Sequence, residues 1–340
     1  MPDDKPKSKR ASATPIPETQ PSPSSLRNLP YPDDSMPVAP EAPIVVSAVK
    51  RKGLYGKGYI RDKHDTSKDL TIRHLLGARL QASPPEFMAM EQFIAGIMGV
   101  KNQGDTSRCL AYAMARAAQL RCAYLGVPLK EFPSVDGLYT VARAWDRHQQ
   151  GFLPEQQPLT DTGSIPNCMV QGANDFGVAL ESRWPSDDLS KINAEPTIEE
   201  LRAASMLKFP GYYRISSSGA QRLEDVKQAL AAGYPVLIGV QVDPAFEAYS
   251  GGIAQATTVP PTPKAVTAPD PLQDLGGHGL CLYGYKTFAG GVTLFRGCNS
   301  WDVTWGDNGL FWADVTWLCD DTVMDILVIT CDPSHYAVAA

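Results

Sequence analysis

Residues 100–110 read VKNQGDTSRCL, and an apolar pattern of helical spacing begins at Cys109. A helix N-terminus favours a thiolate, because its free backbone N–H groups and its dipole stabilise negative charge. Gln103 stands six residues earlier, so its side-chain amide and the Cys109 amide are placed to hydrogen-bond one oxyanion. This predicts a nucleophile with an oxyanion hole. The alternative interpretation is a buried helix cysteine and an ordinary loop glutamine.

A second candidate is His278, in the run GGHGL at residues 276–280, where a buried strand is expected to start. Imidazole changes its protonation near neutral pH, which suits a base for a thiol. Neighbouring glycines allow another backbone to approach closely. The alternative is a structural histidine. The remaining histidines lie in polar contexts and are weaker candidates: His64, His74, His148 and His335.

The third candidate is Asn299, which opens the run NSWDVTWGDNG at residues 299–309. An amide beside an imidazole fixes its orientation and tautomer, as the third member of a catalytic triad does. Two tryptophans would keep water from that hydrogen bond. The alternative is an aromatic β-hairpin whose turn is Asp-Asn-Gly, and both interpretations can hold together.

Composition excludes several functional classes. The net charge is -6 and apolar residues make up 43% of 340, so no basic field attracts nucleic acid or an acidic membrane. Neither a signal peptide nor a membrane-spanning run is visible, which predicts a cytoplasmic protein or one exported by a signal-independent route. The seven cysteines form no CxxC pair, so no metal site and a reduced protein are expected.

The composition and the apolar pattern of the chain change along its length. Residues 1–45 hold 11 of the 29 prolines and few large apolar residues, which predicts a disordered extension. Residues 46–83 are expected to pack on the catalytic domain, where a regulatory role stays open, and residues 84–340 are expected to form that domain. Helical patterns then dominate the first half and strand patterns the second, as in an α+β enzyme.

Taken together, these motifs resemble those of the papain-like cysteine peptidases, in an arrangement of the bacterial type. Val-Lys-Asn-Gln-Gly followed by Cys, His followed by Gly-Tyr, and Asn-Ser-Trp followed by Trp-Gly-x-Asn-Gly occur in family order over roughly residues 84–330. The chain departs from the family at residues 106–110, where TSRCL replaces Cys-Gly-Ser-Cys-Trp. The usual disulfide partner of the first of those cysteines is replaced by Asp161.

The resemblance implies a papain-like fold with a helical left subdomain, a β-barrel-like right subdomain and the active-site cleft between them. It implies Cys109 as nucleophile, His278 as base, Asn299 as orienting residue and Gln103 as oxyanion donor, without metal or cofactor. It also implies a substrate-binding wall and a roomy pocket for apolar side chains such as Leu or Phe. The expected substrate-binding residues are Gly163, Ser164, Ile165, Pro166, Gly239, Gly276, Gly277, Gly279 and Trp301.

The implied function is a cysteine endopeptidase that acts on peptides or proteins through an acyl-enzyme. Two alternatives stay open: a thiol amidase, isopeptidase or acyl transferase, and a non-catalytic binding protein on a degenerate peptidase fold. The N-terminal extension is expected to occupy the protein's own cleft, with anchors at Tyr31, Met36, Val38 and residues 44–46. A solvated tail or an export address is the alternative.

Overall fold

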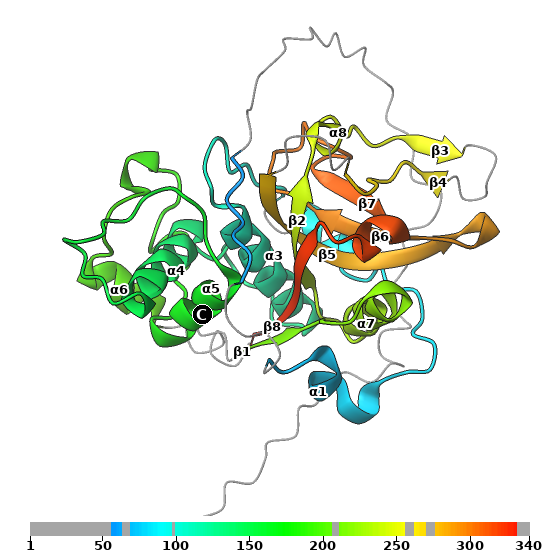
Figure 1. Ribbon diagram of the computed structural model, residues 1–340, viewed down its shortest axis with the longest axis horizontal. Coiled ribbons are helices and arrows are strands. Elements are labelled where there is room, and N and C mark those ends of the chain that lie inside the picture. The colour runs from blue at the N-terminus through cyan, green and yellow to red at the C-terminus, as the bar shows by residue number, and fades with distance from the viewer. Residues whose placement is uncertain are drawn as a thin grey trace, which may run out of the picture. The chain divides into compact units, whose positions relative to one another are not determined.

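The computed structural model describes residues 56–62, 69–96, 99–205, 211–255, 262–269 and 276–331 (Figure 1). The chain divides into two units, Met1–Val49 and Lys50–Ala340, and every described residue belongs to the second. The extension expected at residues 1–45 and its proposed anchors therefore lie outside the described residues.

Most of the helices precede the strands along the chain. The helices are α1 Ile72–Leu76, α2 Glu91–Gly96, α3 Cys109–Tyr124, α4 Val135–Gln149, α5 Pro166–Asp175, α6 Ile198–Ala204, α7 Gly219–Ala231, α8 Pro244–Glu247 and α9 Val315–Cys319. The strands are β1 Gly211–Arg214, β2 Val236–Val242, β3 Ile253–Gln255, β4 Thr262–Pro263, β5 Gly276–Phe288, β6 Val292–Cys298, β7 Leu310–Asp314 and β8 Val323–Thr330. Within the described residues, no helix is both long and apolar enough to cross a membrane.

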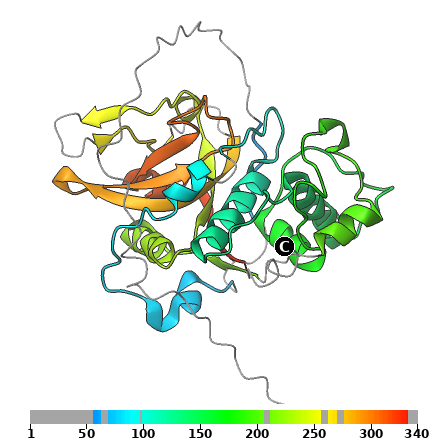
Figure 2. The ribbon, with the colours of Figure 1, turned by 180° about the vertical axis from the view of Figure 1, so that it is seen from behind.

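Helix α3 lies between the helical group α4–α6 and the main sheet, as the front and back views show (Figures 1 and 2). All of its residues from Cys109 to Ala123 are buried. Its alanines leave room for α4 on one side and for β5 on the other. The nucleophile-bearing end of α3 is thereby fixed where the helical part meets the strands.

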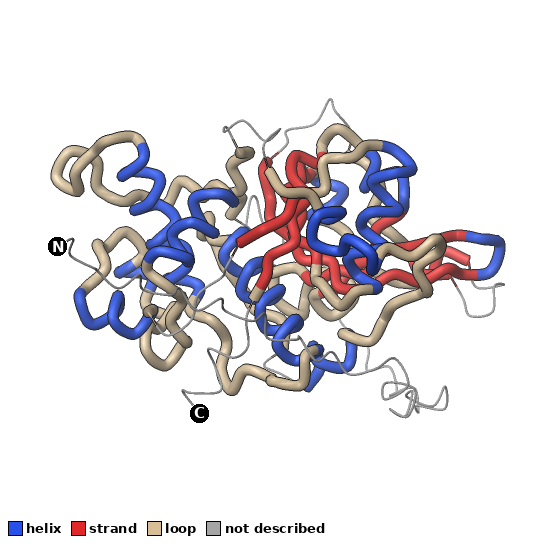
Figure 3. The backbone as a smooth tube through the Cα atoms, turned by 90° about the horizontal axis from the view of Figure 1, so that it is seen from below, coloured by secondary structure: helices blue, strands red, loops and turns tan. Residues whose placement is uncertain are grey.

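The main sheet is antiparallel, with the strand order β1-β8-β2-β5-β6-β7. It is open, because its edge strands β1 and β7 do not pair with each other among the described residues. The strands of the expected barrel-like right subdomain therefore form an open sheet, in which the edge strand β1 has four residues and, of the strands given above, pairs with β8. Figure 3, seen from below, shows the strands gathered apart from the helices at the left.

One register matters for the site. Gly239 of β2 stands opposite both Gly279 of β5 and Asp325 of β8. Paired residues on adjacent strands point to the same face, so these three positions form a row across that face.

Sequence patterns locate some elements better than others. The helix expected from Cys109 is α3, and the helices expected at Ile165–Phe176 and Leu223–Ala232 correspond to α5 and α7. Helix α4 and strand β8 were not expected. Polar side chains interrupt the apolar pattern of α4, yet three of them, Asp136, Arg143 and Arg147, are buried in this fold.

Candidate active site

Cys109 is the first residue of α3 and is fully buried. Gly279 of β5 packs directly on this end of the helix: a Cβ there would lie 2.9 Å from Leu110 Cα and 3.3 Å from the Cys109 carbonyl carbon. Only a glycine allows this approach, and His278 is the residue before it on β5.

His278 is also fully buried, and its orientation is fixed by Asn299. The His278 Nε2 atom lies 2.8 Å from Asn299 Oδ1, which also accepts a hydrogen bond from the Ser300 N–H at 2.7 Å. The Trp301 ring covers the imidazole, with ring centroids 4.4 Å apart. Among the described residues, the His278 Nδ1 atom has no hydrogen-bond partner.

Gln103 presents its amide N–H groups to backbone carbonyls. Its Nε2 donates to the Thr106 carbonyl at 2.6 Å and to the Gly56 carbonyl at 2.8 Å. The Ser300 hydroxyl donates to Gln103 Oε1 at 2.6 Å and so fixes which end of the amide is the donor. The role of Ser300 was not recognised in the sequence, although it stands inside the Asn-Ser-Trp motif.

Residues 56–62, which we call the covering segment, lie across this site. The Tyr59 N–H donates to the Gly277 carbonyl at 3.1 Å. The Gly58 carbonyl accepts from the Ser164 N–H at 2.8 Å, and the Ile60 N–H donates to the Ser164 carbonyl at 3.1 Å. The segment thus makes strand-like bonds with Ser164 on one side and with β5 on the other.

The Tyr59 side chain enters the sheet face beside Gly239. A Cβ on Gly239 would lie 1.9 Å from the Tyr59 ring, and the Tyr59 hydroxyl donates to Asp325 Oδ2 at 2.9 Å. Tyr59 is only 6% exposed, so its ring fills this pocket. The pocket expected beside Gly239 therefore holds a side chain of the chain itself.

The ends of the covering segment are held by ion pairs. Lys57 Nζ lies 2.7 Å from Glu247 Oε1. At the other end, Asp62 pairs with the buried Arg214, which also binds Asp325. Charges therefore fix the segment on both sides of Tyr59.

With the segment in place, both candidate catalytic groups, Cys109 and His278, favour their neutral forms. Burial raises the pKa of the Cys109 thiol, while backbone hydrogen bonds from Gly58 and Gly279 act in the opposite direction. Burial also lowers the pKa of His278 to about 4, against the raising effect of Asn299 and with a smaller lowering effect of the Lys57 charge. Both shifts disfavour a thiolate–imidazolium pair.

The predicted substrate-binding residues fall into three groups. Ser164 and Gly277 bond the covering segment, and Gly163 and Gly276 lie where a Cβ would meet Gly58 and Lys57. Ile165 is the N-cap residue of helix α5, and Pro166 is the first residue of that helix. Gly279 touches the nucleophile helix and Trp301 covers His278. Their roles in substrate binding stay predictions.

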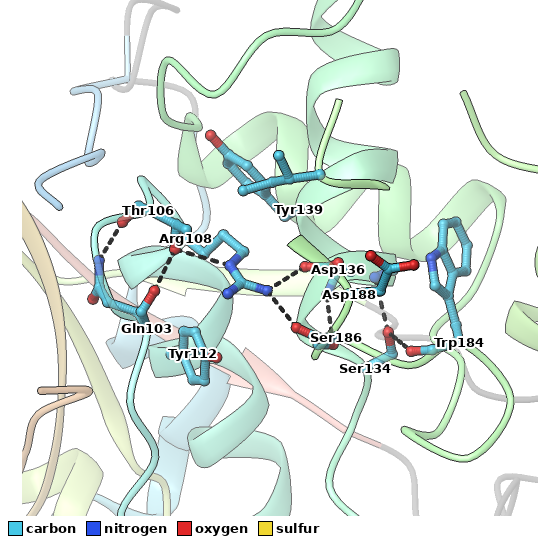
Figure 4. Close-up of polar contacts among 12 residues, drawn as sticks. Gln103, Thr106, Arg108, Tyr112, Ser134, Asp136, Tyr139, Trp184, Ser186 and Asp188 are labelled. Atoms are coloured by element: carbon cyan, nitrogen blue, oxygen red, sulfur yellow. Dashed lines mark hydrogen bonds and ion pairs between the residues drawn. The ribbon is translucent and has the colours of Figure 1, made fainter. Parts of the chain in front are cut away.

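Arg108, beside the nucleophile, points away from the site into the helical part (Figure 4). It is 2% exposed, and its Nη1 contacts Asp136 at 2.5 Å and the Ser186 carbonyl at 2.9 Å. Its Nε donates to the Thr106 hydroxyl at 2.9 Å. Arg108 therefore ties the start of α3 to α4 and is not available to a substrate.

Comparisons with known proteins agree with this geometry. The model of the papain family cysteine proteases matches residues 164–319. A peptidase C1-like protein of Acanthamoeba polyphaga mimivirus is 29% identical over 226 residues, which are 65% of this chain and 66% of that protein. The chain thus spans just under two thirds of this relative's length.

Solved structures share the fold. Xylellain, a cysteine protease from Xylella fastidiosa, superposes with a TM-score of 0.57 at 22% identity, over 84% of this chain and 99% of its own. Procathepsin B from Trypanosoma congolense superposes with a TM-score of 0.58 at 16% identity, over 82% and 87%. The chain therefore has a papain-like fold, and residues 164–319 match the model of the papain family cysteine proteases.

Proposed function

We propose that the protein is a cysteine endopeptidase whose nucleophile is Cys109 and whose base is His278. The observation that carries this proposal is the bond between Gln103 and a backbone carbonyl. Gln103 Nε2 donates to the Gly56 carbonyl at 2.8 Å, and an amide that binds a peptide carbonyl in this way is suited to bind the oxyanion that forms from one.

Catalysis would proceed through an acyl-enzyme. His278 Nε2 is held by Asn299, so Nδ1 takes the proton of Cys109. The thiolate attacks a peptide carbonyl carbon while Gln103 and the Cys109 amide stabilise the oxyanion. The imidazolium then protonates the leaving amine. Water attacks the thioester, the acid is released and the thiol is restored.

We also propose that the covering segment keeps the enzyme inactive. The Tyr59 N–H donates to the Gly277 carbonyl and the Gly58 carbonyl accepts from the Ser164 N–H, so the covering segment bonds to residues on both sides of the site. A segment held in this way would keep a substrate from Cys109. The similarity to procathepsin B supports this proposal, since that protein is a precursor form. A bacterial-type origin stays a prediction.

Labelling by an epoxide thiol reagent tests both proposals. The parent full chain should react slowly, and Tyr59→Ala should react at least tenfold faster because the segment loses its buried ring. Tyr59→Ala should also hydrolyse small fluorogenic peptides. The double variant Cys109→Ala, Tyr59→Ala should neither react with the epoxide nor hydrolyse these peptides. Cys319→Ala is the matched control, because Cys319 is the most exposed cysteine of the described residues.

The outcomes separate the alternatives. Labelling and turnover that persist in the Cys109→Ala, Tyr59→Ala chain would rule out this nucleophile. Labelling without peptide hydrolysis would favour an acyl transferase or amidase. Absence of both, in a chain that still folds, would favour a binding protein. Equal rates for the parent and Tyr59→Ala would show that the covering segment does not control access.

A further inference from the structure

The pocket that the Tyr59 side chain fills ends at the carboxylate of Asp325. Gly279, Gly239 and Asp325 stand in one row across strands β5, β2 and β8. Gly279 touches the nucleophile helix, Gly239 touches the Tyr59 ring, and Asp325 receives the Tyr59 hydroxyl at 2.9 Å. Neighbouring strands lie about 4.8 Å apart, so the carboxylate is about two strand spacings from the glycine at Cys109. An aromatic side chain with a terminal donor spans that distance.

Arg214 holds Asp325 in place from outside the pocket. Arg214 Nη1 binds Asp325 Oδ1, while Oδ2 accepts from the Tyr59 hydroxyl and from the Asp62 N–H at 3.3 Å. Both Arg214 and Asp325 are buried, at 4% and 6% exposure. When the covering segment leaves, Oδ2 loses both of these donors and Oδ1 keeps the guanidinium.

We infer that Asp325 makes this pocket select tyrosine side chains of substrates over phenylalanine. The selected position is the residue before the one whose carbonyl is attacked, and the inference rests on the proposed peptidase function. A tyrosine restores the donor that Oδ2 has lost. A phenylalanine fills the same volume and leaves a buried carboxylate oxygen unpaired, which is costly. A lysine there would place its charge close to Arg214.

Two substrates that differ only by the hydroxyl test this inference. In the full-length Tyr59→Ala chain, kcat/KM should be about tenfold to a hundredfold higher for Tyr than for Phe, since a hydrogen bond to a charged group has about that effect. Asp325→Asn in the same background should bring the ratio close to one. Asp69→Asn should preserve the ratio, because Asp69 binds Arg214 Nε at 2.7 Å and not Tyr59.

A second readout needs no substrate. Tyr59→Phe in an otherwise unchanged chain should increase epoxide labelling of Cys109 severalfold, because the covering segment then carries the disfavoured side chain. Equal Tyr and Phe turnover, or faster turnover of a Lys substrate, would overturn the inference while leaving the peptidase intact. Absence of both labelling and hydrolysis would instead overturn the proposed function, and this inference with it.

Discussion

The proposed catalytic role of Gln103 depends on how its side-chain amide is oriented. A glutamine amide can present either its oxygen or its nitrogen to a ligand, and only the nitrogen stabilises an oxyanion. The Ser300 hydroxyl, 2.6 Å from Gln103 Oε1, selects the nitrogen. The backbone reinforces this contact, since the Gln103 N–H donates to the Ser300 carbonyl at 2.8 Å. The Asn-Ser-Trp motif therefore orients two side chains of the proposed catalytic set: Asn299 orients His278, and Ser300 orients Gln103.

Ser300→Ala should lower kcat about tenfold with little change in KM, because the amide of Gln103 can then turn away. Gln103→Ala should cost more, about 100- to 1000-fold, as the loss of an oxyanion donor typically does. Both variants are compared in the Tyr59→Ala chain, with the exposed Ser216→Ala as control. A Ser300→Ala chain with unchanged kcat would show that the hydroxyl is dispensable.

At the scale of elements, the start of α3 is fastened by polar contacts. The position resembling the family's disulfide partner is Asp161, whose carboxylate accepts from the Ser107 N–H at 3.0 Å and from the Tyr139 hydroxyl at 2.7 Å. Arg108 adds the buried pair with Asp136. Hydrogen bonds do not depend on redox conditions, so this fastening holds in a reducing environment.

Asp161→Ala should lower the melting temperature by several degrees, because it leaves the Ser107 N–H and the Tyr139 hydroxyl without their acceptor. Loss of such contacts costs about 1–3 kcal/mol, and 1 kcal/mol shifts the melting temperature of a large domain by about 2–4 °C. Asp187→Ala, at an exposed site, is the control. Calorimetry of the two variants measures the difference, and identical melting temperatures would contradict this role.

At the scale of the whole described unit, the covering segment couples folding to the protonation of the site. Burial lowers the pKa of His278 to about 4. Between about pH 4 and 6.5, the folded, covered state therefore binds fewer protons than the unfolded chain. Stability therefore rises with pH in that range and falls as the solution becomes acidic. The raised pKa of Asp62, caused first by its burial, acts in the opposite direction from its ordinary value of 3.8 upward.

Unfolding followed from pH 7 to pH 4 tests this coupling. The parent should lose more stability than His278→Ala over that range, because the variant has no imidazole to protonate on unfolding. His148→Ala, in which an exposed histidine is removed, should follow the parent. Parallel curves for the parent and His278→Ala would show that His278 is not held neutral by the fold.

The sequence by itself determined the candidate catalytic set. Gln103, Cys109, His278 and Asn299 each stand in a short motif whose local chemistry is readable, and the structure brings His278 and Asn299 within hydrogen-bond distance. Helix α3 was equally readable, because its apolar spacing continues for several turns. Their catalytic roles await the experiments above.

Only the tertiary structure decided what covers the site and what ends its pocket. Tyr59 and Asp325 are 266 residues apart, and Arg214 reaches Asp62 across 152 residues, so no local pattern could pair them. The anchors expected at Tyr31 and beyond lie outside the described residues, and it is Tyr59 that fills the pocket. The open sheet likewise depends on whether distant edge strands meet. These contacts join residues that are far apart in the sequence, so short-range sequence patterns do not predict them.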